Sequence, residues 1–472
     1  MALSLQQKNN FTSGNRQEFK DRYERLFFPD EKALLEADKR RQDILLDLGT
    51  SVSIGCLGTK LDMTNLSPGC RLCVEGLWSC LFINGKCNGN CFYCPTSQDE
   101  VGSPTTNTVS FQDSKDYIAY LRLFGFKGAS ISGGEPLLTL DKSVRFIRSI
   151  KKHFGENIYV WLYTNGILAT RDIMKRLAGA GLDEIRFDIG ATGYSMRHLE
   201  HAVGVIPTVT VEIPAVPEEN ERMKCLLPTL YDCGVQHLNL HQLRLTPYNF
   251  EKMVIRNYRF LHGKKVTVLD SELTALELLL HGKKNNIKLP INYCSFPYKN
   301  QFQALAARRR NASFILKSYE SLTENGFIRT LLLIGNHEVL AQYLTAFERA
   351  GFNATLWNMN GPEKLYIHLD LLPHIDFANI GLQVFYSSAY QRQSSGYRNP
   401  FSKVAISNKM SIVIERETSP YRFDLSPEQI AFLLSVIMAP GNNHALQSLE
   451  TVDLPEKMLD FEYMREGLAE YY

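Results

Sequence analysis

The stretch from residue 78 to residue 94 reads WSCLFINGKCNGNCFYC, an apolar run followed at once by a dense cysteine motif. The apolar run at 78–84 predicts a buried β-strand. Cys87, Cys91 and Cys94 then form a C-x3-C-x2-C loop, in which Gly89 suits a tight turn. Three thiolates at this spacing can bind zinc or one face of a four-iron cluster, and the spacing alone does not separate the two.

Five more β-type runs follow this strand, and amphipathic helical stretches separate them. The runs begin near residues 128, 158, 184, 208 and 237. Strands and helices in this alternation predict right-handed βαβ units around a parallel sheet. We therefore expect an α/β fold with a partial (β/α)6 barrel, whose chemistry gathers at the carboxyl ends of the strands.

The segments before and after the barrel have different patterns. Residues 1–66 are charged and helix-prone, with an amphipathic run at 29–48, and predict an N-terminal helical cap. The barrel itself is expected over residues 67–300. Residues 301–472 order their strands and helices differently, so we expect a C-terminal α+β domain that holds a substrate or a partner.

Composition limits the class of protein. The chain has 472 residues, of which 44% are hydrophobic and 22% charged, and its formal net charge is +2. This balance is ordinary for a globular protein and gives no strong nucleic-acid signal. The first residues lack a signal-peptide pattern, and no window approaches about 18 consecutive apolar residues, so we expect a cytoplasmic protein that does not enter a membrane. Most of the ten cysteines lie before residue 95, which indicates metal binding rather than disulfides.

A second motif follows the second strand of the predicted barrel. Gly133, Gly134, Glu135 and Pro136 form a turn at the carboxyl end of the strand GASIS. The glycines would let the backbone approach a ligand, and Glu135 or its neighbouring carbonyls could accept hydrogen bonds from an ammonium group. Because this turn and the cysteine loop both end strands of one parallel sheet, we expect them to share a face.

The paired motifs resemble the radical S-adenosylmethionine (SAM) superfamily over residues 78–245. Within it, the chain is similar to a subgroup related to pyruvate formate-lyase activating enzymes, with an extra upstream C-x2-C. The resemblance implies that Cys87, Cys91 and Cys94 bind a 4Fe–4S cluster whose remaining iron holds SAM. It also assigns cofactor contacts by position: Tyr93 to the adenine, Gly133 to Pro136 to the methionyl amine, and Thr164, Asn165 and Asp188 to the ribose and carboxylate.

The same resemblance points to a second metal site. Cys70 and Cys73 form the upstream C-x2-C, and Cys294 lies in a distant Tyr-Cys-Ser. The subgroup pairs these two features, which implies an auxiliary iron–sulfur cluster or zinc on Cys70, Cys73 and Cys294, with Cys56 as the next candidate. The alternative is that these are reduced structural cysteines.

The expected function is reductive cleavage of SAM to a 5′-deoxyadenosyl radical, followed by hydrogen abstraction from a small metabolite, an amino acid, a peptide or a protein. The resemblance implies a low-potential electron donor such as flavodoxin or ferredoxin. His241, on the sixth strand, is a candidate catalytic residue, although a lone histidine on a strand is more often a structural hydrogen-bonding group. The competing hypothesis is a non-catalytic zinc- or iron–sulfur-binding interaction protein.

Overall fold

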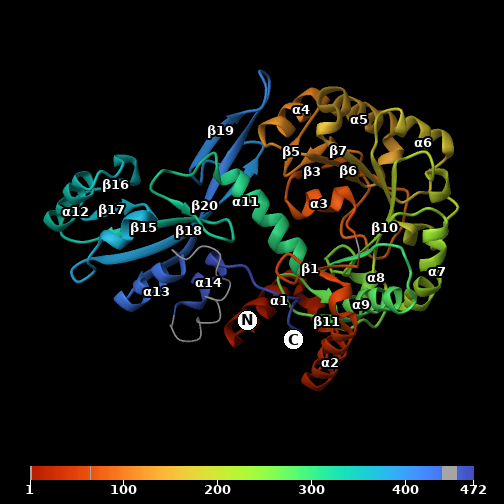
Figure 1. The fold of residues 1–472 in the computed structure, drawn as a ribbon, viewed down its shortest axis with the longest axis horizontal. Coiled ribbons are helices and arrows are strands. Elements are labelled where there is room, and N and C mark those ends of the chain that lie inside the picture. The colour runs from red at the N-terminus through yellow and green to blue at the C-terminus, as the bar shows by residue number, and fades with distance from the viewer. Residues whose placement is uncertain (1–2, 64, 438–453) are drawn as a thin grey trace. The chain divides into compact units, whose positions relative to one another are not determined.

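The computed structural model describes residues 3–63, 65–437 and 454–472 and contains two compact units (Figure 1). The first unit comprises Met1–Thr106, Ser110–Gln303 and Arg465–Tyr472. The second comprises Asn107–Val109 and Ala304–Met464. Residues 1–66, predicted as a separate cap, belong to the first unit, and the three-domain division with boundaries at 66/67 and 300/301 stays a prediction.

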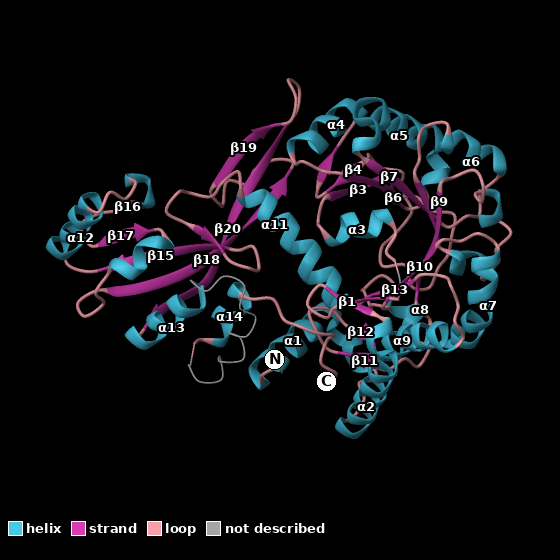
Figure 2. Cartoon of the chain, in the orientation of Figure 1, coloured by secondary structure: helices cyan, strands magenta, loops and turns pink. Residues whose placement is uncertain are grey.

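The first unit is built on a curved sheet in which neighbouring parallel strands follow one another in chain order (Figure 2). Six of these strands match the predicted runs. They are β3 (Trp78–Asn84), β6 (Gly128–Gly133), β7 (Tyr159–Thr164), β8 (Glu184–Phe187), β9 (Thr208–Pro214) and β10 (His237–His241). A further strand, β13 (Ile291–Cys294), continues the parallel sheet beyond β10 and was not predicted. The fold is therefore the expected mixed α/β arrangement with a partial parallel barrel.

Both edges of the parallel sheet carry short antiparallel strands. Beyond β13 lie β2 (Lys60–Asp62) and β1 (Ser53–Gly55), and beyond β3 lie β4 (Thr105–Thr106) and β5 (Val109–Ser110). A two-stranded ribbon, β11 (Phe260–Leu261) with β12 (Thr267–Val268), stands apart from this sheet.

Amphipathic helices cover the outer face of the sheet (Figure 1). In α5 the buried apolar residues Val144, Ile147 and Ile150 recur at helical spacing, which turns one stripe of the helix toward the strands. Side-chain caps fix where other helices begin: Asp113 accepts from Lys115 N before α4, and Thr170 accepts from Ile173 N before α6. The outer helices are α4 (Ser114–Leu123), α5 (Leu140–Phe154), α6 (Arg171–Ala178), α7 (Asn220–Asp232) and α9 (Leu269–Lys284), and the short α8 (Phe250–Val254) follows β10.

One short helix lies on the inner side of the curved sheet. Helix α3 (Pro68–Val74) begins at Ser67, whose hydroxyl accepts from Cys70 N. A Cβ on Gly69 would overlap the guanidinium of Arg186 and lie 3.2 Å from the Trp161 ring, so α3 sits directly against inward-facing side chains of β7 and β8. This close approach depends on glycine at position 69.

The N-terminal helices and the last residues of the chain pack together on the first unit. These helices are α1 (Leu5–Phe19) and α2 (Glu31–Leu48). Arg41 on α2 contacts Glu272 on α9 at 3.3 Å, and the Tyr471 hydroxyl donates to the same carboxylate at 2.8 Å. The Tyr293 hydroxyl also donates to Glu272, at 3.0 Å, so this buried carboxylate connects α2, β13 and the chain end to α9.

The second unit is an antiparallel sheet with its own core of buried residues such as Leu331, Phe347 and Ile367. Inside it, Arg416 pairs with Glu320 at 2.7 Å. The strands run in the order β16 (Trp357–Met359), β17 (Lys364–Ile367), β15 (Ile328–Ile334), β18 (Gly381–Arg392), β20 (Ser411–Leu425) and β19 (Phe401–Ala405), with β14 (Ser321–Leu322) paired to β15. Its helices are α11 (Ala304–Ala312), α12 (His337–Arg349), α13 (Pro427–Ile437) and α14 (Glu456–Glu462). Within the described residues of the whole chain, no helix is long and apolar enough to cross a membrane.

Candidate active site

The cysteine loop follows β3 and lies half-buried. Its base is closed by a hydrogen bond from Cys87 N to Gln98 O at 3.1 Å. Cys87 Sγ accepts from Gly89 N at 3.3 Å and from the side-chain amide of Asn165 at 3.5 Å. The loop is therefore tied to the end of β7 through one of its sulfur atoms.

Burial opposes ionisation of these thiols. It raises the pKa of Cys87, and it raises the pKa of Cys91 to about 12, with the charge of Asp188 adding to the effect. A bound cation supplies the positive charge that keeps such thiols deprotonated. As free thiols, Cys87 and Cys91 therefore stay protonated at neutral pH.

The Gly-Gly-Glu-Pro turn presses against the chain that leads into the cysteine loop. Gly134 N donates to Asn84 O at 2.9 Å, and Glu135 N donates to Lys86 O at 2.7 Å. A Cβ on Gly133 would overlap Asn84 O, and one on Gly134 would overlap Lys86 O. The two glycines thus let the turn approach the backbone at residues 84–86. From the sequence, we had expected them to let the backbone approach a ligand.

Glu135 joins the ends of β6 and β7. Its carboxylate is fully buried and accepts from Leu137 N at 2.9 Å, Thr164 Oγ1 at 2.8 Å and Asn165 N at 2.7 Å. Burial raises its pKa, while these three donors oppose the rise. The side chain therefore positions Thr164 and Asn165.

Tyr93 links the last turn of the cysteine loop to the end of β8. Its hydroxyl donates to both carboxylate oxygens of Asp188, at 2.8 and 2.9 Å, and Gly190 N donates to the same carboxylate at 3.1 Å. Burial raises the pKa of Asp188 to about 6. A Cβ on Gly190 would lie only 2.7 Å from the Tyr93 hydroxyl, so this glycine is needed for the contact. Gly190 was not predicted as a site residue, although it closes the FDIG motif.

The structure thus gathers the predicted cofactor residues at one edge of the sheet, from the ends of β3, β6, β7 and β8. The donor set fits a 4Fe–4S cluster with three protein ligands: three free thiols in one loop, with Gly89 between two of them. In the described part of the chain, no three His, Cys, Asp or Glu side chains converge closely enough to hold a single metal ion. A cluster binds each thiolate to a different iron, so its cysteines stand further apart than the ligands of one ion.

A buried charge network lies further down the inner face of the sheet. Arg186 on β8 contacts Glu184 at 2.8 Å and Glu212 on β9 at 2.7 Å. His241, the predicted catalytic candidate, directs Nε2 to Glu212 at 2.6 Å. Arg186 and His241 hold the pKa of Glu212 well below its ordinary value in spite of burial. His241 therefore has a structural partner, and a catalytic role for it stays a prediction.

The cysteines predicted for a second metal site also come together. Cys70 and Cys73 lie on α3, and Cys294 ends β13. The Lys60 ammonium lies 2.9 Å from Cys294 Sγ, and its charge, with that of His241, lowers the pKa of Cys294 against the effect of burial. Cys56 is half-buried and interacts electrostatically with Lys60 and Cys294.

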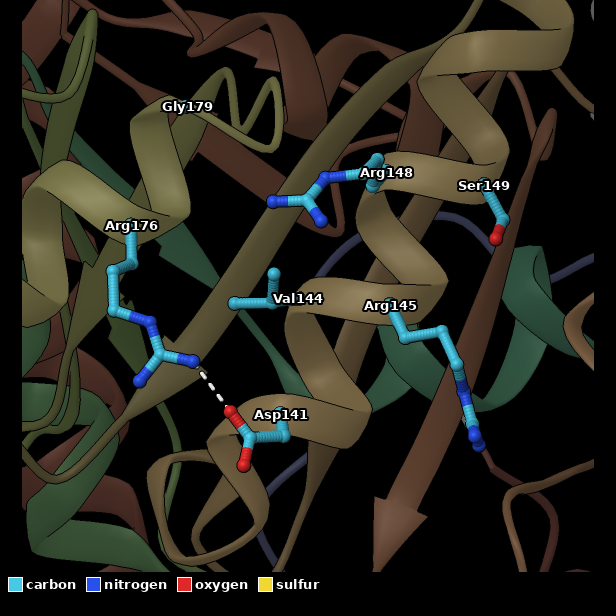
Figure 3. Close-up of a pocket in the computed structure, with 7 residues that line it drawn as sticks. All are labelled: Asp141, Val144, Arg145, Arg148, Ser149, Arg176 and Gly179. Atoms are coloured by element: carbon cyan, nitrogen blue, oxygen red, sulfur yellow. Dashed lines mark hydrogen bonds and ion pairs between the residues drawn. The ribbon is translucent and has the colours of Figure 1, made fainter.

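A hollow of about 380 Å³ lies between α5 and α6 on the outer helical layer (Figure 3). Arg145, Arg148 and Arg176 line it, and Arg176 pairs with Asp141. None of the predicted site residues lines this hollow.

Known proteins resemble this chain over the site region. Residues 81–199 match the model of the radical SAM superfamily. A protein of Methanocaldococcus jannaschii, named as a glycyl-radical enzyme activating enzyme, is 31% identical over 297 residues, which cover 60% of this chain and 78% of that protein. The GTP 3′,8-cyclase of Lactiplantibacillus plantarum is 33% identical over 109 residues, covering 23% of this chain and 32% of the cyclase.

Among solved structures, Streptococcus suis SuiB bound to S-adenosylmethionine superposes with a TM-score of 0.37 and 13% identity, over 49% of this chain and 56% of SuiB. The family assignment rests on the sequence matches and on the agreement of the cysteine loop with them. The chain belongs to the radical SAM superfamily and is an enzyme of that family, whose cofactors are a 4Fe–4S cluster and SAM.

Proposed function

We propose that Cys87, Cys91 and Cys94 bind the cluster and that this chain abstracts a hydrogen atom from a partner protein. The observation that carries the proposal is the convergence of four strand ends on the cysteine loop, through the contacts of Asn165 with Cys87 and of Tyr93 with Asp188. When bound, the cluster supplies the electron that cleaves SAM to the 5′-deoxyadenosyl radical.

The residues of the chain would hold and orient SAM. The turn at Gly133 to Pro136 would contact the methionyl amine, and Glu135 keeps Thr164 and Asn165 in position beside it. Tyr93 lies in the loop on the side of Asp188, where it would contact the adenine. Such fixed polar groups orient a reactive cofactor and exclude competing reactions.

One observation favours a protein as the substrate: the relative from Methanocaldococcus jannaschii is named as an activating enzyme for a glycyl-radical enzyme. A glycine Cα–H is the bond that such a partner would present. The matched relatives are named as enzymes, so the competing hypothesis of a non-catalytic metal-binding protein is not favoured.

The first experiment measures SAM cleavage. Anaerobically reconstituted protein should contain iron and sulfide and release 5′-deoxyadenosine from SAM with dithionite, and reduced flavodoxin or ferredoxin should replace dithionite. Alanine at Cys87, Cys91 and Cys94 should abolish release, whereas alanine at the exposed Cys225 should not. Protein that contains only zinc and releases no 5′-deoxyadenosine would refute the proposal.

The second experiment identifies the class of substrate. An extract of cells grown in deuterated medium is separated by ultrafiltration into macromolecules and small molecules, and each fraction is incubated with the reduced enzyme and SAM. We expect deuterium in 5′-deoxyadenosine with the macromolecular fraction, and loss of the signal after protease treatment. Deuterium transfer only from the small-molecule fraction would assign a metabolite or amino acid instead.

A further inference from the structure

A second group of thiols lies on the inner side of the sheet, and the proposed function uses none of them. Cys70 and Cys73 face this side from α3, and Cys294 reaches it from the end of β13. We propose that these three cysteines bind a second iron–sulfur cluster inside the barrel and that Lys60 is its charge partner.

Each of the three sulfur atoms accepts at least one hydrogen bond. Cys70 Sγ accepts from the amide of Asn239 at 3.3 Å. Cys73 Sγ accepts from the Tyr298 hydroxyl at 3.3 Å and the Gln303 amide at 3.4 Å. Cys294 Sγ accepts from Lys60 Nζ at 2.9 Å and the Asn292 amide at 3.5 Å.

These donors come from separate elements of the first unit, among them β2, β10 and β13. Neutral thiols are weak acceptors, whereas cluster-bound thiolates are regularly surrounded by N–H and O–H groups. Five donors directed at three sulfur atoms therefore fit negatively charged sulfur.

Lys60 supplies the stronger argument. Its side chain is 3% exposed, and its ammonium contacts the side-chain oxygen of Asn292 and the sulfur of Cys294. A buried ammonium without a negative partner costs several kcal/mol, so a negative charge is required beside it.

The nearby carboxylates already have partners. Glu184 and Glu212 both pair with Arg186, and Glu212 also contacts His241. The group that the Lys60 ammonium contacts besides Asn292 is the sulfur of Cys294, so a thiolate there would supply the negative charge that the burial of Lys60 requires. The site thus fits anionic sulfur.

Among the residues that the structure describes, neither these cysteines nor Cys87, Cys91 and Cys94 converge on the position of a single metal ion. The ligands of a cluster bind different irons and need not converge on one point, so this finding is compatible with a cluster at both places.

The ammonium of Lys60 should also set the reduction potential of this cluster. Reduction adds a negative charge, and a positive charge held beside it in a buried site stabilises the reduced state. Lys60 should therefore raise the midpoint potential, and a neutral residue in its place should lower it.

The test first removes the other cluster. A variant with alanine at Cys87, Cys91 and Cys94 should release no 5′-deoxyadenosine but should still bind about half of the wild-type iron and sulfide. Adding Cys70→Ala or Cys294→Ala should remove that remainder, and adding Cys225→Ala should not. Should the multiple variants fail to fold, more than about four iron atoms per wild-type chain gives the same answer. A triple variant free of iron, or one that holds only zinc, would overturn the proposal while leaving SAM cleavage by the wild type untouched.

The role of Lys60 is tested in the otherwise intact chain. Lys60→Met should retain iron and sulfide and shift the midpoint potential of one cluster downward in an EPR-monitored redox titration. Lys60→Arg keeps the charge and should restore the wild-type potential. Equal potentials in the Met variant and the wild type would exclude Lys60 as the charge partner.

Discussion

The Tyr93 hydroxyl donates to both carboxylate oxygens of Asp188, at 2.8 and 2.9 Å, and so joins the cysteine loop to the end of β8. This side chain thus connects the loop after β3 with the end of β8, two segments that are distant in the sequence. Several expected outcomes depend on contacts of this kind.

Tyr93→Phe removes the donor while keeping the ring. The buried carboxylate of Asp188 then loses a partner, which should lower the free energy of unfolding by about 1–3 kcal/mol. Iron content should stay at the wild-type level, whereas SAM affinity, measured by equilibrium dialysis, should fall. Tyr397→Phe, at a residue that is 85% exposed, is the matched control and should change neither quantity. Unchanged SAM affinity in Tyr93→Phe would show that the hydrogen bonds of the Tyr93 hydroxyl to Asp188 do not support SAM binding.

Asp188 predicts a specific pH dependence. Burial raises its pKa from 3.8 to about 6, so the folded chain binds this proton more tightly than the unfolded chain. The resulting stability is fully present below about pH 3.8 and is lost as the pH rises through about 6. Asp188→Asn abolishes this titration, so between about pH 4 and pH 7 the wild type should lose free energy of unfolding relative to the variant. Urea unfolding of the metal-free chain across this range measures the difference. The exposed Asp232→Asn should follow the wild type, and parallel curves for all three proteins would rule out the raised pKa.

Gly134→Ala places a methyl group on the carbonyl oxygen of Lys86. Because both partners are backbone, the turn or the cysteine loop must move, and we expect lower iron incorporation and a lower melting temperature. Gly14 is the control, since no atom lies within 4 Å of a Cβ built there and the residue is inside α1. Gly14→Ala should leave iron content unchanged and add up to about 1 kcal/mol of stability. Full iron incorporation in Gly134→Ala would show that the turn does not support the loop.

Glu135→Gln tests whether the carboxylate works through its three donors. The amide nitrogen of glutamine cannot accept a hydrogen bond, so at least one of Leu137 N, Thr164 Oγ1 and Asn165 N loses its acceptor. A cost of about 1–3 kcal/mol in unfolding free energy is expected, together with slower release of 5′-deoxyadenosine. Glu100→Gln, on the exposed loop after the cysteines, should match the wild type in both assays. If Glu135→Gln released 5′-deoxyadenosine at the wild-type rate, Glu135 would not be a positioning residue.

The parallel strands β3 and β6 to β10 could be predicted from sequence because each is a local apolar run between turn residues. Strand β13 was missed because its four residues, INYC, are too short for a periodic signal, and a ribbon and two helices separate it from β10. Cys87, Cys91 and Cys94 are equally local, since one loop carries all three.

The inner face of the sheet could not be predicted in the same way. Lys60 meets Cys294, and Arg186 meets Glu212, only after strands from different βα units have paired. Such buried polar contacts depend on the register of neighbouring strands, and no short window of sequence contains both partners. Gly190 could not be predicted for the same reason. A side chain at this position would collide with Tyr93, which lies in another loop.

The chain leaves the first unit at Gln303 and re-enters it at Arg465, and Arg465 N donates to the side chain of Gln301 at 3.2 Å. The exit and re-entry points are therefore neighbours, and the antiparallel sheet is an insertion within a continuous catalytic scaffold. The residues proposed for the two clusters and for SAM all lie outside that insertion. The radical chemistry proposed for this chain would therefore use side chains of the first unit alone.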